Sequence, residues 1–387
     1  MSSLNESNSN KSKLRPKLMC FFIIFIIVIS AIIYLYYTFF LKNEQNTDDA
    51  YVSGNIVSVS SLVPGSVVSV WYKNNDLVNS GDILVKLDDT DAKIDFNNAK
   101  ANLAQSVRKI RQLYIESALD SDKIKQATIA HNQAVQDYRR LQGLTGSGAV
   151  SKQQLQHAKN LAESTEAELN ISKRELQSNK ALLLKSELKK QPEVVSAADA
   201  VRKSWIALQR TCILSPVTGY VAERNVNVGE TLSVGKPILS IVPLDQVWLN
   251  ANFKETQLAN IKLGQQVVFT TDFYGDDIAY TGTISGINMG TGSAFSLLPA
   301  QNASGNWIKI VQRIPVKIEI SSEQLKKFPL RIGLSANVKI NTNTGLGSTL
   351  PTSTRKEPAY TSNALILDMS PVEKIITDII ESNDSYE

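Results

Sequence analysis

Few residues of this chain have types and spacing that could support chemistry. Its 387 residues include only two histidines, His131 and His157, and two cysteines, Cys20 and Cys212. Zinc sites need close sets of such ligands, and neither histidine has a cysteine or a carboxylate cluster beside it. His131 instead falls on the apolar seam of a predicted helix. We therefore expect no metal site at these residues.

The remaining polar motifs also give no catalytic centre. Asp272, Asp276 and Asp277 lie close together, but they lack the spacing of a calcium loop and are typical of turns. The sequence has no G-x-S-x-G motif, Walker sequence or dinucleotide fingerprint. We expect neither catalytic residues nor a cofactor. The chain should not be an enzyme, and any energy for its work should come from a partner.

The charge of the chain argues against a nucleic-acid partner. The formal net charge is +4, and most of the excess lies before residue 19, at Lys11, Lys13, Arg15 and Lys17. A nucleic-acid-binding surface needs a basic patch on the folded domain. The rest of the sequence carries almost no excess charge.

One apolar segment determines the expected topology. Met19 to Leu41 runs 23 residues without a charge, and about 20 apolar residues suffice for a helix to cross a bilayer. The cations before the segment place the N-terminus in the cytoplasm and residues 42–387 outside. A cleaved signal peptide is the alternative, but its apolar region is shorter and ends at small residues. We therefore expect a retained single-pass anchor.

Two stretches, 50–88 and 211–244, resemble each other as β-rich halves. Val63–Val67 matches Val217–Val221, and sixteen residues after the turn glycine of each copy comes another glycine, Gly81 or Gly235. Two unrelated hairpins with ordinary turn glycines are the alternative. Equal spacing over this length favours one β-domain split into two halves.

Between the halves the sequence predicts a long helical hairpin. Apolar residues recur every seven positions on both flanks of a glycine-rich link at Gly143, Gly146 and Gly148, which is typical of an antiparallel coiled coil. Ser151 to Gln154 forms a capping box at the start of the second leg. Pro192 should kink this leg or begin a new helix.

After residue 246 the pattern returns to short strands, which favours a small antiparallel barrel. We expect these strands at Val247–Asn252, Gln266–Thr271, Tyr280–Ile287, Ile308–Ile320 and Asn337–Ile340. A long loop, 289–307, interrupts them, and loops of this length are often functional. Residues 344–360 should be irregular, and a short amphipathic helix is expected within 372–381.

The sequence resembles the HlyD-type periplasmic adaptors, also called membrane fusion proteins. The resemblance is carried by a T-x-I-x-[AS]-P-x-x-G-x-V strand, whose residues here are Thr211, Ile213, Pro216, Gly219 and Val221. The segments 47–52, 252–257 and 274–277 and the 289–307 loop are more similar to the EmrA-type adaptors of multidrug efflux. The resemblance implies a mixed α and β fold: an N-terminal transmembrane helix, a split lipoyl-like β-domain interrupted by the antiparallel coiled-coil hairpin, and a small antiparallel β-barrel.

The resemblance divides the chain into a cytoplasmic N-terminus (1–18), the transmembrane helix (19–41), the first half-domain with the strand entering the barrel (47–89) and the hairpin (90–210), whose tip is at 142–150. The second half-domain (211–246), the barrel (247–343) and a tail (344–387) follow. A lipoyl or biotin carrier would present a lysine where the halves join. The junction here, Leu87 to Asp91, has none.

The resemblance also implies a role and partners. Such an adaptor joins an inner-membrane pump of the major facilitator superfamily to a TolC-like outer-membrane channel, as a homo-oligomer anchored in the inner-membrane lipid with its bulk in the periplasm. Arg140, Leu144 and Ser151 match the Arg-x3-Leu-x6-Ser pattern with which these adaptors meet the channel. Phe295, Leu297 and Leu298 form an apolar patch expected to face the pump, although packing onto the barrel is the alternative.

Two other functions stay open at this stage. An adaptor of an ABC-type secretion system is the first, and the gene for a 14-helix transporter beside this one would argue against it. A membrane-tethered structural coiled coil is the second. It predicts no export defect on deletion, and it leaves the split β-domain unexplained.

Overall fold

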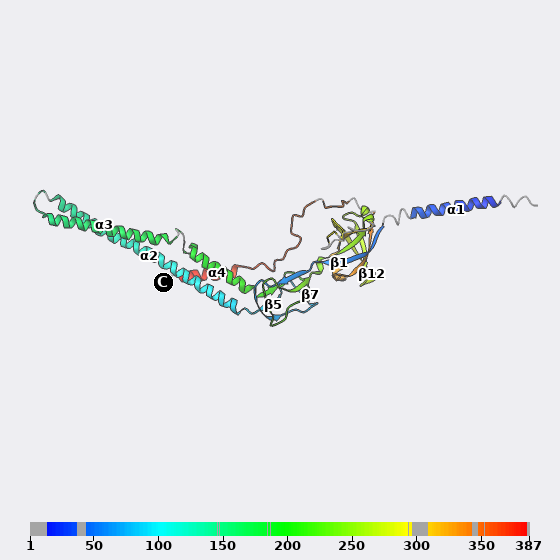
Figure 1. The fold of residues 1–387 in the computed structure, drawn as a ribbon, viewed down its shortest axis with the longest axis horizontal. Helices are drawn as coiled ribbons and strands as arrows, with labels where there is room; N and C mark the ends of the chain where they lie inside the picture. Colours follow the sequence, from blue (N-terminus) through cyan, green and yellow to red (C-terminus); the bar gives the residue numbers. More distant parts are fainter. Residues whose placement is uncertain are drawn as a thin grey trace, which may run out of the picture.

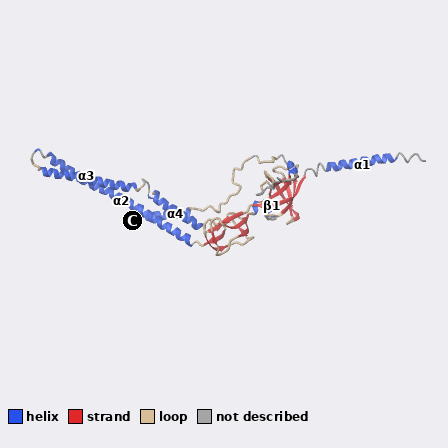
Figure 2. Cartoon of the chain, viewed as in Figure 1, coloured by secondary structure: helices blue, strands red, loops and turns tan. Residues whose placement is uncertain are grey.

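The structure, a computed structural model, describes residues 14–36, 44–144, 146, 148–183, 185, 187–292, 294–295, 309–342, 347–351 and 353–384. The molecule is elongated (Figure 1). Helix α1 (Leu14–Tyr36) lies at one end, followed along the long axis by a β-barrel, a β-sandwich and a helical hairpin whose tip forms the other end. The two β-domains and the helices are separate in space (Figure 2). The expected fold class is confirmed.

Helix α1 contains the first part of the predicted anchor. The described side chains from Met19 to Ile32 are all exposed. Within the part of the chain that the structure describes, no helix is both long and apolar enough to cross a membrane. Residues 37–41 of the predicted span lie outside the described residues.

The sandwich is built from both half-domains. Its sheets have the orders β2-β9-β7-β4 and β6-β5-β3-β8, so each contains two strands of each half. The strands of the first half are β2 (Val57–Ser60), β3 (Gly65–Val70), β4 (Leu77–Val78) and β5 (Ile83–Leu87). Those of the second are β6 (Cys212–Leu214), β7 (Gly219–Arg224), β8 (Thr231–Leu232) and β9 (Pro237–Val242).

Equivalent contacts repeat in the two halves and bind each to the other. The buried hydroxyl of Ser61 donates to the Val63 carbonyl at 2.5 Å, and that of Ser215 donates to the Val217 carbonyl at 2.6 Å. The N–H of Gly235 then donates to the Ser61 carbonyl, and the N–H of Gly81 to the Ser215 carbonyl, each at 2.8 Å. Neither half buries its core without the other.

The hairpin consists of helix α2 (Thr90–Gly143), which packs antiparallel against α3 (Lys152–Ala181) and then α4 (Pro192–Gln209). At about 1.5 Å per residue, the 54 residues of α2 extend roughly 80 Å. Pro192 is the first residue of α4, which confirms a new helix start. The second leg already breaks after Ala181, ten residues earlier than the sequence suggests, and a short 3₁₀ turn, η3 (Leu188–Lys190), lies in the gap.

A buried carboxylate lies in the seam of the hairpin. The Asp120 side chain is 3% exposed, accepts a hydrogen bond from the Lys123 ammonium at 3.0 Å, and accepts another from the Asn179 amide of α3. The hydrogen bond from Lys123 holds the pKa of Asp120 below its usual value, with a further lowering from Asn179, while burial opposes the shift. A single polar contact of this kind fixes the register of a coiled coil.

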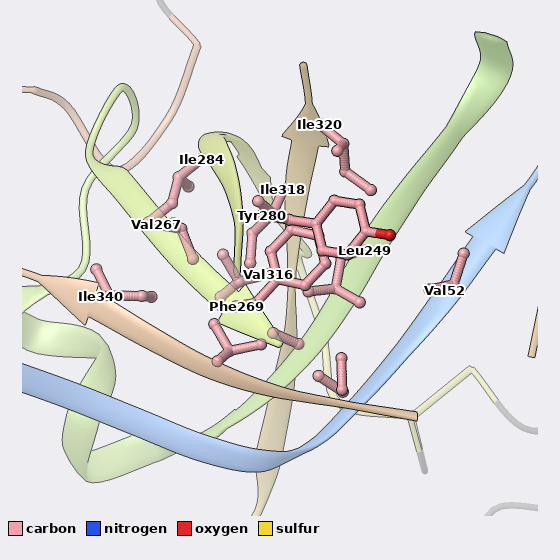
Figure 3. Packing of buried hydrophobic residues seen from close by; sticks show 14 of the residues in the cluster. Val52, Leu249, Val267, Phe269, Tyr280, Ile284, Val316, Ile318, Ile320 and Ile340 are labelled. Atoms are coloured by element: carbon pink, nitrogen blue, oxygen red, sulfur yellow. The ribbon is translucent and has the colours of Figure 1, made fainter. Parts of the chain in front are cut away.

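The barrel closes in the order β1-β10-β13-β12-β11-β14. Its strands are β1 (Glu44–Gly54), β10 (Val247–Lys254), β11 (Gln266–Thr271), β12 (Gly275–Ile287), β13 (Arg313–Ile320) and β14 (Ser335–Asn341), and its short helices are η4 (Leu244–Gln246), η5 (Glu255–Asn260) and α5 (Ser322–Lys327). Figure 3 shows the core, in which the rings of Phe269 and Tyr280 stack with centroids 5.1 Å apart. Strand β1 precedes the hairpin in the sequence, whereas its neighbours in the barrel, β10 and β14, follow it. The chain must therefore return from the hairpin before the barrel can close.

Two local expectations for the barrel are wrong. Asp276 and Asp277 belong to β12 and not to a turn, because the left-handed Gly275 (φ 69°) completes the turn before them. The strand expected from Ile308 begins at Arg313, since its partner β10 ends at Lys254, which pairs with Arg313.

The C-terminal segment ends in helix α6 (Ser370–Asp384), which confirms the predicted amphipathic helix and extends it. Where this helix packs was not predicted from the sequence. It lies against α2 and α4 at the base of the hairpin, with Val372 and Ile376 buried.

The two halves of the sandwich allow a matched test of close packing. A Cβ on Gly219 would lie 2.5 Å from the Val242 carbonyl oxygen, whereas a Cβ on the equivalent Gly65 would meet Leu87 at an ordinary 3.4 Å. We expect Gly219→Ala to lower the free energy of unfolding by about 1–3 kcal/mol, the usual cost of overpacking. Gly65→Ala should change it by less than about 1 kcal/mol. Urea denaturation measures both, and equal losses would contradict the asymmetry.

The seam carboxylate should make hairpin stability depend on pH. Because the pKa of Asp120 is lower in the folded state, its contribution is present above the unfolded value of about 3.9 and is lost as the pH falls through the folded value. Asp120→Asn should therefore flatten the fall in melting temperature between pH 5 and pH 3, followed by circular dichroism. Asp122→Asn, at a 69% exposed neighbour, is the control. An unchanged slope in Asp120→Asn would refute this role.

Candidate docking sites at the two ends of the molecule

The three residues of the tip pattern gather at the free end of the hairpin. Arg140 lies in the last turn of α2, Leu144 follows that helix directly, and Ser151 precedes α3. Leu144 is 44% exposed, and the Arg140 side chain is 71% exposed while it pairs with Asp137 at 2.7 Å. Thr145 and Ser147, between them, lie outside the described residues. The structure thus brings a cation and an apolar side chain to one exposed surface.

Ser151 has a structural task at the tip. Its hydroxyl accepts a hydrogen bond from the N–H of Gln154 at 3.1 Å, and the Gln154 side chain accepts one from the N–H of Ser151 at 3.0 Å. This reciprocal pair is the predicted capping box, and it fixes where α3 begins. Arg140 and Leu144 are therefore the cleaner candidates for a contact with a partner.

The 289–307 loop belongs to the end of the barrel nearest α1. In the antiparallel barrel, the start of β1 lies beside the ends of β10 and β14, and the start of β13 pairs with the end of β10. The loop joins the end of β12 to the start of β13, so it emerges where the chain enters from α1 (Figure 1). Of the expected apolar patch, Phe295 is 73% exposed, whereas Leu297 and Leu298 lie outside the described residues.

The same end of the barrel holds a polar cluster that was not predicted from the sequence. Asp49 pairs with Arg313 at 3.0 Å and accepts a hydrogen bond from the Asn252 amide at 2.9 Å, while Gln257 donates to the Asn46 carbonyl at 3.1 Å. Asp49, Asn252 and Gln257 come from two of the quoted family segments, Asn46 directly precedes the first of them, and Arg313 begins β13. Asn46, Gln257 and Arg313 line an open groove of about 870 Å³, together with Lys254 and Lys339. The similarity of segments 47–52 and 252–257 to the family was the signal in the sequence that could have indicated this cluster.

The family strand motif is structural. Ile213 and Val221 are buried, at 7% and 1% exposed, and Gly219 is held against the Val242 carbonyl. Thr211 donates from its hydroxyl to the Leu208 carbonyl at 2.8 Å, where α4 ends. The carbonyl of Pro216 accepts hydrogen bonds from the hydroxyls of Ser80 and Ser362. These contacts join the second half-domain to the hairpin, to the first half and to the C-terminal segment.

The described residues contain no group of three or more His, Cys, Asp or Glu side chains that could hold a metal ion. His131 lies in the seam of the hairpin, with Nδ1 at 3.4 Å from the Thr165 hydroxyl. Among the described residues, Arg140 and Leu144 at the tip and Phe295 at the barrel are exposed, and the barrel and the tip lie far apart along the molecule. Their arrangement suits contact with two different partners.

Comparison with known proteins identifies the family. The description "EMRA, alpha-helical hairpin domain" matches residues 90–211, and "AAEA-like beta-barrel domain" matches residues 246–341. The chain is 45% identical to the probable multidrug resistance protein EmrK of Escherichia coli K12 over 98% of this chain and 99% of that protein. It is 46% identical to the multidrug export protein EmrA of the same strain over 90% of each. The solved periplasmic adaptor protein EmrA aligns with 77% of this chain and 98% of that one, at 20% identity and a TM-score of 0.39. The chain therefore belongs to the EmrA-type family of membrane fusion proteins, the periplasmic adaptors.

Proposed function

We propose that this protein is the periplasmic adaptor of a multidrug efflux pump, which links an inner-membrane transporter to an outer-membrane channel. EmrA-type adaptors work with such transporters and channels. The observation that carries the proposal is the separation of two exposed candidate surfaces by a barrel, a sandwich and a hairpin in line (Figure 1). A rod of this length has no use in burying a core, but it suits a bridge between two membranes.

The N-terminal segment is the proposed inner-membrane anchor, with residues 1–18 in the cytoplasm and the bulk of the chain in the periplasm. The described apolar side chains from Met19 to Ile32 are exposed and so remain to be covered. Lipid covers such a surface without a protein partner. The four cations that precede the segment favour this orientation.

The barrel end is the proposed contact with the transporter, because it lies on the anchor side. The absence of nucleotide-binding motifs in the chain leaves the source of energy to that partner. The resemblance of the sequence to EmrA-type adaptors implies a proton-driven transporter of the major facilitator superfamily and not an ABC exporter, and the relatives EmrK and EmrA are named for multidrug resistance and export. The hairpin tip then faces a TolC-like channel, in a homo-oligomer of the adaptor.

The tip can be tested by substitution. Arg140→Asp combined with Leu144→Ser should abolish resistance to compounds that kill a deletion strain. Both side chains are exposed, so unfolding should change by less than about 0.5 kcal/mol apart from the weak Arg140–Asp137 pair. Arg174→Asp makes the same change of charge on exposed α3, away from the tip, and should keep full resistance. Full resistance in the double variant would remove the tip from the contact.

The orientation can be tested by crosslinking in cells. In a Cys20→Ser, Cys212→Ser background, Ser296→Cys should crosslink to the inner-membrane transporter, because its loop lies on the anchor side. Ala149→Cys, at the exposed tip, is the matched probe and should crosslink to the outer-membrane channel. Mass spectrometry identifies both products, and exchange of the two partners would invert the proposed orientation.

A further inference from the structure

The chain beyond the barrel returns to the root of the hairpin. Ser348 accepts a hydrogen bond on its carbonyl from the N–H of Leu263, at the barrel, at 3.0 Å. Residues 353–361 are all exposed and arch away from the domains (Figure 1). From Ser362 onward the segment regains contacts, first with the sandwich and then with the helices. The part of the segment after the arch therefore packs at a defined place on the sandwich and the helices.

That part contacts both sides of the junction between sandwich and hairpin. The Ser362 hydroxyl donates to the carbonyl of Pro216, in the sandwich. Ala364, Leu365 and Leu367 line a hollow of about 220 Å³ together with sandwich residues and with Gln209 and Arg210, where α4 ends. Helix α6 then covers α2 and α4.

Helix α6 fills a groove that two helices alone could not close. Leu103 and Val107 of α2 and Val194 and Val201 of α4 are 0% exposed, in one cluster with Val372 and Ile376 of α6. Farther up, where α2 pairs only with α3, the residues of α3 that are buried are Ala158, Ala162, Leu169 and Ser172, each 7–9% exposed. The four residues at the root are buried more fully than these, in a cluster to which the third helix contributes.

An ion pair fixes α6 on this groove. Arg202 of α4 donates from Nε and Nη2 to the two carboxylate oxygens of Glu373, at 2.6 and 2.8 Å. Bidentate pairs of this geometry add directional specificity to apolar packing. Arg202 also holds Asp199, at 2.7 Å, so the guanidinium is positioned by α4 before α6 docks.

We propose that residues 362–384 clamp the root of the hairpin, and that the groove between α2 and α4 is an internal docking site for this amphipathic helix. The clamp holds the hairpin at one angle to the sandwich. The exposed arch leaves the barrel free of this restraint. That the fixed angle serves to aim the tip rests on the proposed function. The clamp itself does not depend on the proposed function.

The test measures the angle in the purified full-length protein, without transporter or channel. Spin labels at Val68→Cys in the sandwich and Ala118→Cys in α2, both exposed, report the distance across the junction in a background of Cys20→Ser and Cys212→Ser. The native clamp should give a single narrow distance distribution. Val372→Asp, which puts a carboxylate at a fully buried position, should release α6 and broaden it. A chain that ends at residue 361 should do the same while keeping every strand.

Charge reversal tests the docking site itself. Arg202→Glu and Glu373→Arg should each speed proteolysis within the docked segment 362–384 on the order of 10-fold, by raising the population of undocked tail, and the double reversal should restore the native rate. Asp378→Arg, on the exposed face of α6, is the control for the change of charge and should leave the rate unchanged.

Three results would overturn the proposal. The first is an unchanged narrow distribution in the chain that ends at residue 361. The second is a failure of the double reversal to restore protection. The third is a distribution that depends on protein concentration, which would assign α6 to a second copy of the chain. Failure of the native protein, with its narrow distribution, to confer resistance on a deletion strain would instead count against the proposed function and leave the clamp standing.

Discussion

Strands of the two half-domains pair with each other in both sheets of the sandwich, and this pairing determines the course of the chain. Each half supplies two strands to each sheet, and the buried Ser61 and Ser215 repeat the same local contact on either side. Since the halves are separated by the residues from Thr90 to Gln209, that stretch must leave the domain and return to it. An antiparallel helical hairpin does this while burying its own seam. Because β1 closes the barrel, the chain must likewise leave the barrel and return to it at the junction between barrel and sandwich.

The paired junctions explain why the molecule is a rod and not a compact globule. Two strands connect barrel to sandwich, and two helix ends connect sandwich to hairpin, so each domain follows the last along one axis (Figure 1). The candidate docking residues that the structure describes are exposed at two separate places: Phe295 on the side of the barrel that faces α1, and Arg140 with Leu144 at the tip. In this account the function lies in the distance between two surfaces, and no residue needs to perform a reaction.

Much of this architecture could be predicted from the sequence because it depends on local spacing. The equal spacing of glycines indicated the two half-domains, the seven-residue apolar repeat indicated the hairpin, and Pro192 indicated the start of α4. The docking of α6 could not be predicted, since an amphipathic pattern identifies an apolar face but not the groove that receives it. The cluster of Asp49, Asn252 and Arg313 was missed for the same reason: its members are brought together only by the register of β1, β10 and β13.

On the proposed function, the hairpin sets the distance that is required between the two candidate docking surfaces. The most direct test of this requirement removes two heptads from each leg, residues 124–137 of α2 and the opposing residues 160–173 of α3, which shortens the rod by about 20 Å while keeping the seam in phase. The measurement is co-purification of the outer-membrane channel with the adaptor from crosslinked cells. We expect the shortened protein to fold and to retain the inner-membrane transporter but to lose the channel. Recovery of the channel at the level of the full-length protein would contradict this expectation.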